Sequence, residues 1–148
     1  MAKKWRRSER VAAILKTLVD HPGTLFSLGQ FGDLLNSAKS TVSEDLGVIR
    51  DALASFSLGE VETLAGAAGG VRYFPRFTPE QMRAVAEDLS LKLSASERVL
   101  PGGYLYTSDI VFSPRLMQQA GEVIASHFRQ LGAGYVLTVE TKGIPLAL

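Results

Sequence analysis

Apolar residues recur at helical spacing between residues 42 and 56, and this pattern constrains the fold more than any other feature of the chain. Val42, Leu46, Ile49, Leu53 and Phe56 follow one another at steps of four, three, four and three residues. Such steps place them on one stripe of an α-helix, and the stripe must be buried against other elements. The sequence therefore predicts an amphipathic helix over residues 37–50, with a stripe that continues to Phe56.

The opposite side of that helix suits contact with DNA. It carries small hydroxyl groups and cations on the side chains of Lys39, Ser40, Thr41, Ser43 and Arg50. Small hydroxyl groups let a helix approach base edges, and cations reach phosphates. Glu44 and Asp45 lie nearby and repel phosphate. Taken alone, this helix is therefore explained at least as well by an ordinary solvated polar face.

Two shorter helices are predicted in front of it. Ser8 is the candidate N-cap of the first helix, which stops at the sequence HPG of residues 21–23. Ser27 is the candidate N-cap of the second helix, and Asn36 is its expected C-terminal stop. Two short helices joined tightly, the second with a polar face, have the spacing of a helix-turn-helix.

A hairpin is predicted directly after these helices. Residues 59–65 and 71–75 are β-rich runs on either side of a glycine-rich tip at residues 66–70. Three helices followed by a hairpin is the order of a winged helix, so Gly69, Gly70 and Arg72 are candidate contacts to DNA. For the tip by itself, a flexible loop without function is the alternative.

The positive charge of the chain is concentrated at its N-terminus. The net charge is only +1, but residues 1–10 hold five lysines and arginines against one glutamate, which leaves −3 for the other residues. The candidates for phosphate contact in this basic segment are Lys3, Lys4, Arg6 and Arg7. Trp5 interrupts these cations. A solvated, inert terminus is an equal alternative.

Several classes of protein are excluded by composition. There is no cysteine, hence no disulfide or thiolate site, and the two histidines have no metal-ligand spacing. No apolar run approaches the roughly 18 residues of a membrane span, and the N-terminal cations precede no apolar signal segment. We expect a cytoplasmic, globular protein with no cofactor and no membrane partner.

The second half of the chain has the signals of a separate domain. Thr78 followed by Pro79 and Gln81 predicts a helix start, and Ser113 with Pro114 predicts another, with an inward stripe of Met117, Ala120, Ile124 and Phe128. Residues 101–103 predict a turn, and residues 104–106 a short strand. Residues 135–140 are largely apolar and rich in β-formers, as in a strand of a covered parallel sheet.

Residues 141–144 follow that strand and lead into a helix start, which is the geometry of an anion site. An ordinary turn between strand and helix explains the same pattern at least as well. A lone parallel strand cannot bury both of its faces. The sequence therefore predicts that this chain is the front part of a longer protein.

Four stretches resemble, in order, the purine operon repressors of Gram-positive bacteria. They are SAKSTVSEDL at residues 37–46, GAAGGV at 66–71, LPGGY at 100–104 and TKGIPLA at 141–147. The resemblance implies an α+β chain: a winged helix-turn-helix over residues 1–75, then a linker helix and the truncated start of a phosphoribosyltransferase-like α/β domain over residues 76–148. It also implies a homodimeric transcriptional repressor that binds the operator DNA of purine biosynthesis genes.

The resemblance also implies an effector. In the family, the second domain senses phosphoribosyl pyrophosphate and performs no known transferase chemistry. Thr141, Lys142, Gly143 and Ile144 match the pyrophosphate-binding loop. The main effector motif, a strand ending in paired acids and followed by Gly-Gly-Thr, is absent from these 148 residues. Only part of an effector site is therefore expected in this chain.

Two other functions are compatible with parts of the sequence. A phosphoribosyltransferase with a fused helical domain would need an acid, a base or a nucleophile in a site-like arrangement, and the sequence offers none. A winged helix that binds only proteins would not need the basic terminus, the glycine-rich tip, or the cations Lys16, Lys39 and Arg50. We therefore expect a DNA-binding repressor and not an enzyme.

Overall fold

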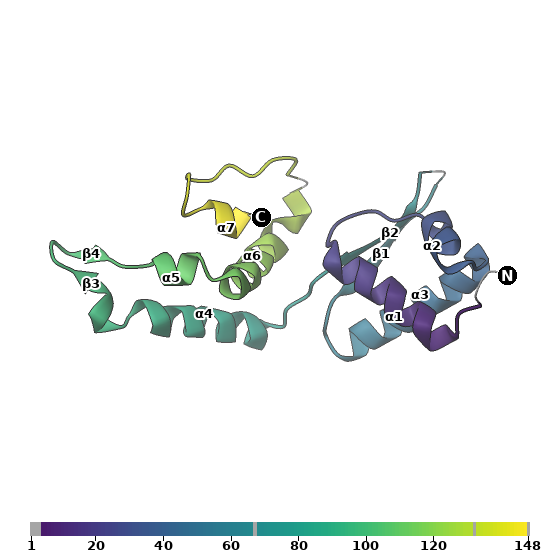
Figure 1. Cartoon of the computed structure of the whole chain (residues 1–148), viewed down its shortest axis with the longest axis horizontal. Coiled ribbons are helices and arrows are strands. Elements are labelled where there is room, and N and C mark those ends of the chain that lie inside the picture. The colour runs from purple at the N-terminus through teal and green to yellow at the C-terminus, as the bar shows by residue number, and fades with distance from the viewer. Residues whose placement is uncertain (1–3, 67, 132, 148) are drawn as a thin grey trace. The chain divides into compact units, whose positions relative to one another are not determined.

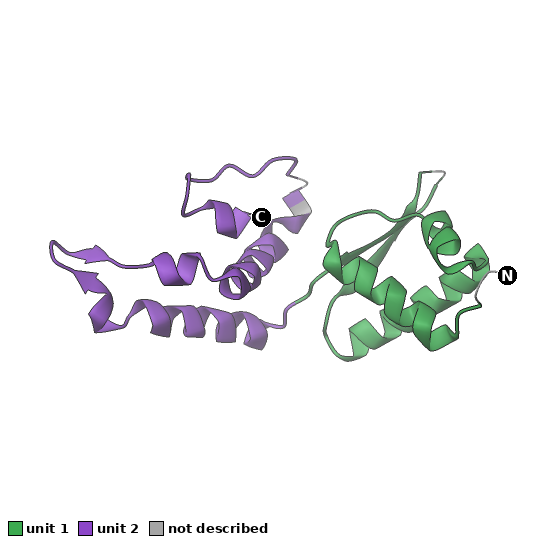
Figure 2. Ribbon diagram, viewed as in Figure 1, with its two compact units in different colours: residues 1–76 green, residues 77–148 purple. Residues whose placement is uncertain are grey.

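The fold is described by a computed structural model covering residues 4–66, 68–131 and 133–147. The chain divides into two compact units, Met1–Arg76 and Phe77–Leu148 (Figure 2). We call them unit 1 and unit 2. The boundary expected from the sequence, between residues 75 and 76, adjoins this division.

The described residues of unit 1 form three helices and a hairpin (Figure 1). The helices are α1 (Arg7–Asp20), α2 (Leu28–Leu35) and α3 (Lys39–Ser55), and the strands are β1 (Glu60–Leu64) and β2 (Gly70–Phe74). The strands pair antiparallel, with Val61 opposite Tyr73 and Thr63 opposite Val71. Phe26 adds an antiparallel bridge to Val71 through two backbone hydrogen bonds of 2.9 and 2.8 Å. This order of elements is consistent with the predicted winged helix.

Side-chain caps determine where α2 begins. The Ser27 hydroxyl accepts from the Gln30 N–H at 3.2 Å, and the Gln30 side chain accepts from the Ser27 N–H at 2.7 Å. These reciprocal bonds satisfy two N–H groups that a helix start would leave unpaired. Asn36 ends the helix in the left-handed conformation, with φ of 48°. Both predicted ends of this helix are confirmed.

The predicted start of α1 is wrong. The helix begins at Arg7 with Arg6 as N-cap, two residues before the position implied by a Ser8 cap. The cause is Glu9, whose carboxylate accepts from the Arg6 N–H at 2.7 Å and so fixes an earlier first turn. The predicted stop is confirmed, because α1 ends at Asp20 and His21 is its C-cap.

The core of unit 1 lies between the helices and the hairpin. Its buried side chains are Ile14, Leu18, Phe31, Leu35, Val42, Leu46, Ile49, Leu53, Val61, Val71 and Tyr73. The predicted stripe of α3 is therefore buried from Val42 to Leu53. Phe56 is the exception, with 72% exposure. It lies beyond the helix end, where Ser57 adopts a φ of 53° and the Leu58 N–H donates to the Leu53 carbonyl at 3.0 Å.

Unit 2 is built mainly from helices. Its elements are α4 (Pro79–Leu93), η1 (Ser96–Arg98), β3 (Val99–Leu100), β4 (Tyr104–Leu105), α5 (Ser108–Val111), α6 (Pro114–Phe128), η2 (Arg129–Leu131) and α7 (Ile144–Ala147). The Thr78 cap, the turn at residues 101–103 and the Ser113 helix start are confirmed. α6 packs against α4, α5 and α7.

Two predictions for unit 2 are wrong. In α6, Met117 and Ala120 are buried as expected, but Ile124 is 43% and Phe128 55% exposed, so the inward stripe covers only the first half of the helix. Residues 135–140 form no strand, and Tyr135 and Leu137 are almost fully exposed. Within the described residues no strand lies beside this segment to pair with its backbone, and a strand needs that pairing.

Candidate nucleic-acid interface

The N-terminal half of α3 presents a polar, solvent-exposed face. Lys39, Ser40 and Ser43 are exposed, whereas Thr41 is half-buried. The stripe from Val42 to Leu53 packs into the core on the other side and thereby fixes which residues face solvent. The structure therefore places most of the predicted polar face of α3 in solvent.

Acidic residues share this exposed face. Glu44 and Asp51 are both exposed on α3. A carboxylate repels phosphate, but it can accept a hydrogen bond from the amino group of cytosine in the major groove. The exposed face of α3 therefore combines small hydroxyl side chains and one lysine with two carboxylates.

Arg50 connects α3 to the hairpin. Its guanidinium donates to the Thr63 hydroxyl of β1 at 2.5 Å. This bond holds the middle of α3 beside the first strand of the hairpin. Arg50, a predicted DNA contact, therefore already has a partner within unit 1.

The predicted contacts in the hairpin have structural partners as well. Arg72 donates to Glu62 across the strands at 2.8 Å, and its guanidinium lies 5.0 Å from the centre of the Phe74 ring. Gly70 is buried, and a Cβ there would overlap the Phe26 carbonyl. A Cβ on Gly69 would overlap the Leu64 carbonyl. Backbone packing accounts for these two glycines, and residue 67 of the tip lies outside the described residues.

The cations of the basic N-terminal segment differ in their surroundings. Lys3 lies outside the described residues, whereas Lys4 and Arg6 are exposed. Within the described part of the chain, neither of them forms an ion pair with an acidic side chain, and the same holds for Lys39. Arg7 is exposed too, but its Nε lies 3.4 Å from the Asp45 carboxylate. The cations of this segment are therefore not equivalent.

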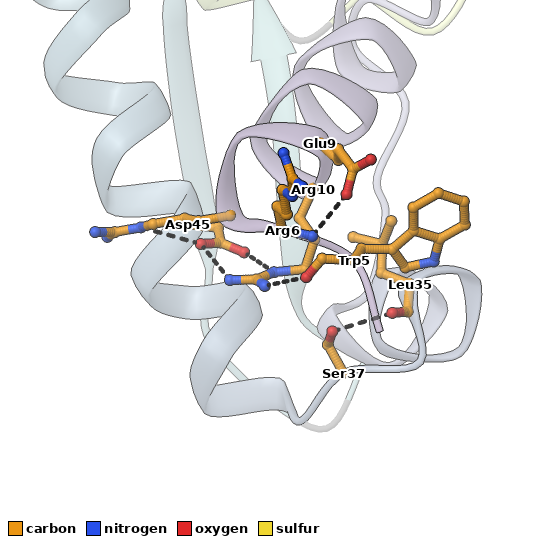
Figure 3. Close-up of polar contacts among 8 residues, drawn as sticks. Trp5, Arg6, Glu9, Arg10, Leu35, Ser37 and Asp45 are labelled. Atoms are coloured by element: carbon orange, nitrogen blue, oxygen red, sulfur yellow. Dashed lines mark hydrogen bonds and ion pairs between the residues drawn. The ribbon is translucent and has the colours of Figure 1, made fainter. Parts of the chain in front are cut away.

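Asp45 is a residue whose importance the sequence analysis missed. The sequence predicts only a repulsive charge, but the Asp45 side chain is buried and receives two hydrogen bonds from Arg10 (Figure 3). The hydrogen bonds that Arg10 donates to the Asp45 carboxylate raise the pKa of Arg10 above its usual value. A signal did exist in the sequence. Asp45 stands three residues after Val42 and four before Ile49, which puts it on the buried side of the helix.

The candidate effector loop lies in unit 2. Thr141 has a φ of 65°, and α7 begins three residues later at Ile144. The Lys142 ammonium donates to the Thr107 hydroxyl at 3.3 Å, which ties the loop to the start of α5. Thr141, Lys142 and Ile144 are exposed, and Gly143 is half-buried.

Neither a metal centre nor a membrane-spanning helix occurs among the described residues. They hold no group of three or more histidines and acids that could bind a metal ion. They also contain no helix that is both long and apolar enough to cross a membrane.

Comparison with known proteins gives consistent matches. Residues 6–75 match the N-terminal family of bacterial purine repressors. Over 97% of its length the chain is 41% identical to a probable purine biosynthesis transcriptional regulator of Streptococcus pneumoniae and 40% identical to the purine biosynthesis transcriptional repressor of Bacillus subtilis. It is 35% identical, over 96% of its length, to the purine biosynthesis transcriptional activator of Lactococcus lactis. These matches cover 50–52% of the other proteins, so the chain spans about half the length of the curated relatives it matches.

Proposed function

We propose that this chain is the DNA-binding part of a transcription regulator of purine biosynthesis genes, because residues 6–75 match the N-terminal family of bacterial purine repressors. Unit 1 binds duplex DNA, with α3 in the major groove and the hairpin along the backbone. The observation that carries this proposal is the family match, which falls on the unit where α3 exposes Lys39, Ser40 and Ser43.

The proposed sign of regulation is repression. The relative from Bacillus subtilis is named a repressor, and that from Lactococcus lactis an activator, although both are similar to this chain over nearly its whole length. Regulators of both signs are thus similar to this chain. Deleting the source gene should raise transcription of the purine genes, measured by quantitative PCR. A fall in transcription would instead identify an activator.

The whole protein is proposed to act as a homodimer and to respond to phosphoribosyl pyrophosphate. A two-fold dimer would place two copies of α3 on two half-sites of one operator. The pyrophosphate would bind at the loop of residues 141–144, where backbone N–H groups and Lys142 can meet an anion. Isothermal titration calorimetry of the full-length protein with this compound and magnesium tests the effector. If no heat of binding is measured, phosphoribosyl pyrophosphate is not the effector.

The proposed activity is binding without catalysis, and its place is the bacterial cytoplasm, where the chromosome lies. Incubation of the full-length protein with phosphoribosyl pyrophosphate and free purine bases should yield no nucleotide. Nucleotide formation above the uncatalysed background would favour the phosphoribosyltransferase alternative.

DNA binding itself is tested by fluorescence anisotropy with labelled duplexes. Binding through phosphates should weaken with salt, by about 0.9 log units in affinity per log unit of salt for each phosphate that is neutralised. Lys4, Arg6, Arg7 and Lys39 are the exposed cations proposed to bind phosphates, with Lys3 as a further candidate outside the described residues. A flat response to salt would remove all of them from the interface.

A further inference from the structure

Asp45 occupies an unusual place for an acid on a DNA-contacting helix. Its side chain is 1% exposed, and Asp45 is the only polar or charged residue in the buried core of the described chain. Its carboxylate accepts from Arg10 Nε at 2.6 Å and from Arg10 Nη2 at 3.1 Å. A buried ion pair of this kind gives little net stability, because removing both charges from water offsets their attraction. A role in function explains this pair better than a role in stability.

Arg10 extends the interaction of Asp45 to the chain before α1. Its third donor, Nη1, binds the Trp5 carbonyl at 3.0 Å (Figure 3). The Trp5 side chain is half-buried and packs against the core of unit 1. Trp5 stands between the exposed cations Lys4 and Arg6, so the backbone that carries both cations is fixed to α1 and, through Asp45, to α3. We call residues 4–6 the arm.

Arg7 is held by the same carboxylate in a different way. Its Nε lies 3.4 Å from Asp45 Oδ1, yet its side chain is 60% exposed. One edge of the guanidinium thus faces the carboxylate, and most of the group remains in solvent. A guanidinium has five N–H donors in a rigid fork, so this arrangement leaves donors for a second anion such as a phosphate.

We propose that Asp45 is a positioning residue for DNA binding, which anchors the arm and Arg7 beside the N-terminal half of α3. The proposal rests on the proposed function of unit 1. A fixed arm loses less conformational entropy on binding than a free one, so its cations contribute more affinity. Asp45 does not touch DNA in this arrangement. It acts through Arg10, Arg7 and the Trp5 carbonyl.

The sign of the effect separates positioning from simple electrostatics. Removing a negative charge beside a DNA-binding face should strengthen binding if only the field of the protein matters. Removing an anchor should weaken binding. Asp45→Asn removes the charge and the anchor, whereas Glu44→Gln removes the same charge from the neighbouring, exposed position of α3. These two variants are therefore a matched pair.

The experiment uses the whole chain and measures two quantities separately: the solvent accessibility of Trp5 in the arm, and the affinity for DNA. Trp5 is the only tryptophan, so acrylamide quenching of its fluorescence reports the arm directly, without DNA. In Asp45→Asn we expect stronger quenching, weaker DNA binding, and a salt dependence shallower by about 0.9 for each phosphate that the arm no longer neutralises. In Glu44→Gln we expect unchanged quenching and equal or tighter binding.

Arg10→Lys serves as the second variant, since it keeps the charge but removes the fork that joins Asp45 to the Trp5 carbonyl. It should resemble Asp45→Asn in quenching and salt dependence. Folded variants with wild-type quenching and wild-type salt dependence would overturn the proposal. If both variants lack helical circular dichroism, the cluster serves folding itself, and the positioning role is overturned too. A wild-type chain that fails to bind DNA would instead overturn the proposed function.

Discussion

Leu46→Ala should destabilise unit 1 more than any substitution on the exposed face of α3. Leu46 is 1% exposed and belongs to the core that α3 shares with α1, α2 and the hairpin. The substitution deletes three carbon atoms, and about 0.8 kcal/mol per buried carbon gives about 2.4 kcal/mol from reduced burial alone. The remaining cavity places the total decrease in unfolding free energy in the range of about 2–5 kcal/mol.

Thermal unfolding followed by Trp5 fluorescence measures this decrease. Since the only tryptophan lies in unit 1, the signal reports that unit and not unit 2. For a unit of this size, each kcal/mol lowers the melting temperature by about 4–8 °C, so a fall of about 10 °C or more is expected. Phe56→Ala is the matched control, because Phe56 is 72% exposed and should change stability by no more than about 0.5 kcal/mol. Equal decreases for the two variants would refute the assignment of the core stripe.

Three further predictions concern the α3 face, the effector loop and unit 2. Ser43→Phe should leave the melting temperature unchanged but weaken operator binding, by about 1–3 kcal/mol for each base that α3 can no longer reach. The control Ser55→Phe, at the other end of α3, should bind DNA normally. Unchanged binding by folded Ser43→Phe would refute the orientation of α3. Calorimetry of this chain with phosphoribosyl pyrophosphate and magnesium should show no saturable binding, because residues 141–144 supply only one part of the implied site, and micromolar binding would contradict this. Hydrogen bonds from Arg98 lower the pKa of Asp109 below its ordinary value, so the pair stabilises unit 2 above about pH 4 and this contribution disappears as the pH falls through the lowered pKa. Asp109→Asn should therefore lower the stability of unit 2 at pH 7, and this difference should shrink as the pH falls below about 4, as measured by circular dichroism. A difference that does not change with pH would exclude the pair.

Local sequence signals predicted much of the fold. The Ser27 and Thr78 capping boxes each involve residues three positions apart, so the sequence alone contains both partners. The stripe from Val42 to Leu53 was predictable for the same reason, since helical spacing is a local property. Two local signals were misread. Glu9 competes with Ser8 for the start of α1, and Ser57 turns the chain at a positive φ without being a glycine.

Interactions between distant residues could not be predicted in the same way. Arg10 and Asp45 are 35 positions apart, and only the packing of α1 against α3 brings them together. The Arg50 bond to Thr63 likewise depends on where β1 lies beside α3. The sequence therefore predicted the cations of the candidate DNA site. Only the structure shows which of these cations are held by acidic side chains and which face solvent.

The segment of residues 135–140 illustrates a different limit. Its composition favours a strand, yet β-propensity describes how well side chains fit a sheet that already exists. No such neighbour lies beside it in the described residues, and the segment is exposed. Sequence pattern alone could not supply the neighbouring strands on which this prediction depended.

The central claim is that unit 1 recognises specific DNA, and one measurement tests it most directly. Fluorescence anisotropy compares the affinity of the wild-type chain for a duplex from the control region of the source organism's purine genes with that for a shuffled duplex of equal length and composition. Two specific base contacts at about 1 kcal/mol each already predict roughly thirtyfold tighter binding to the control region. Equal affinity for both duplexes at physiological salt would contradict the claim.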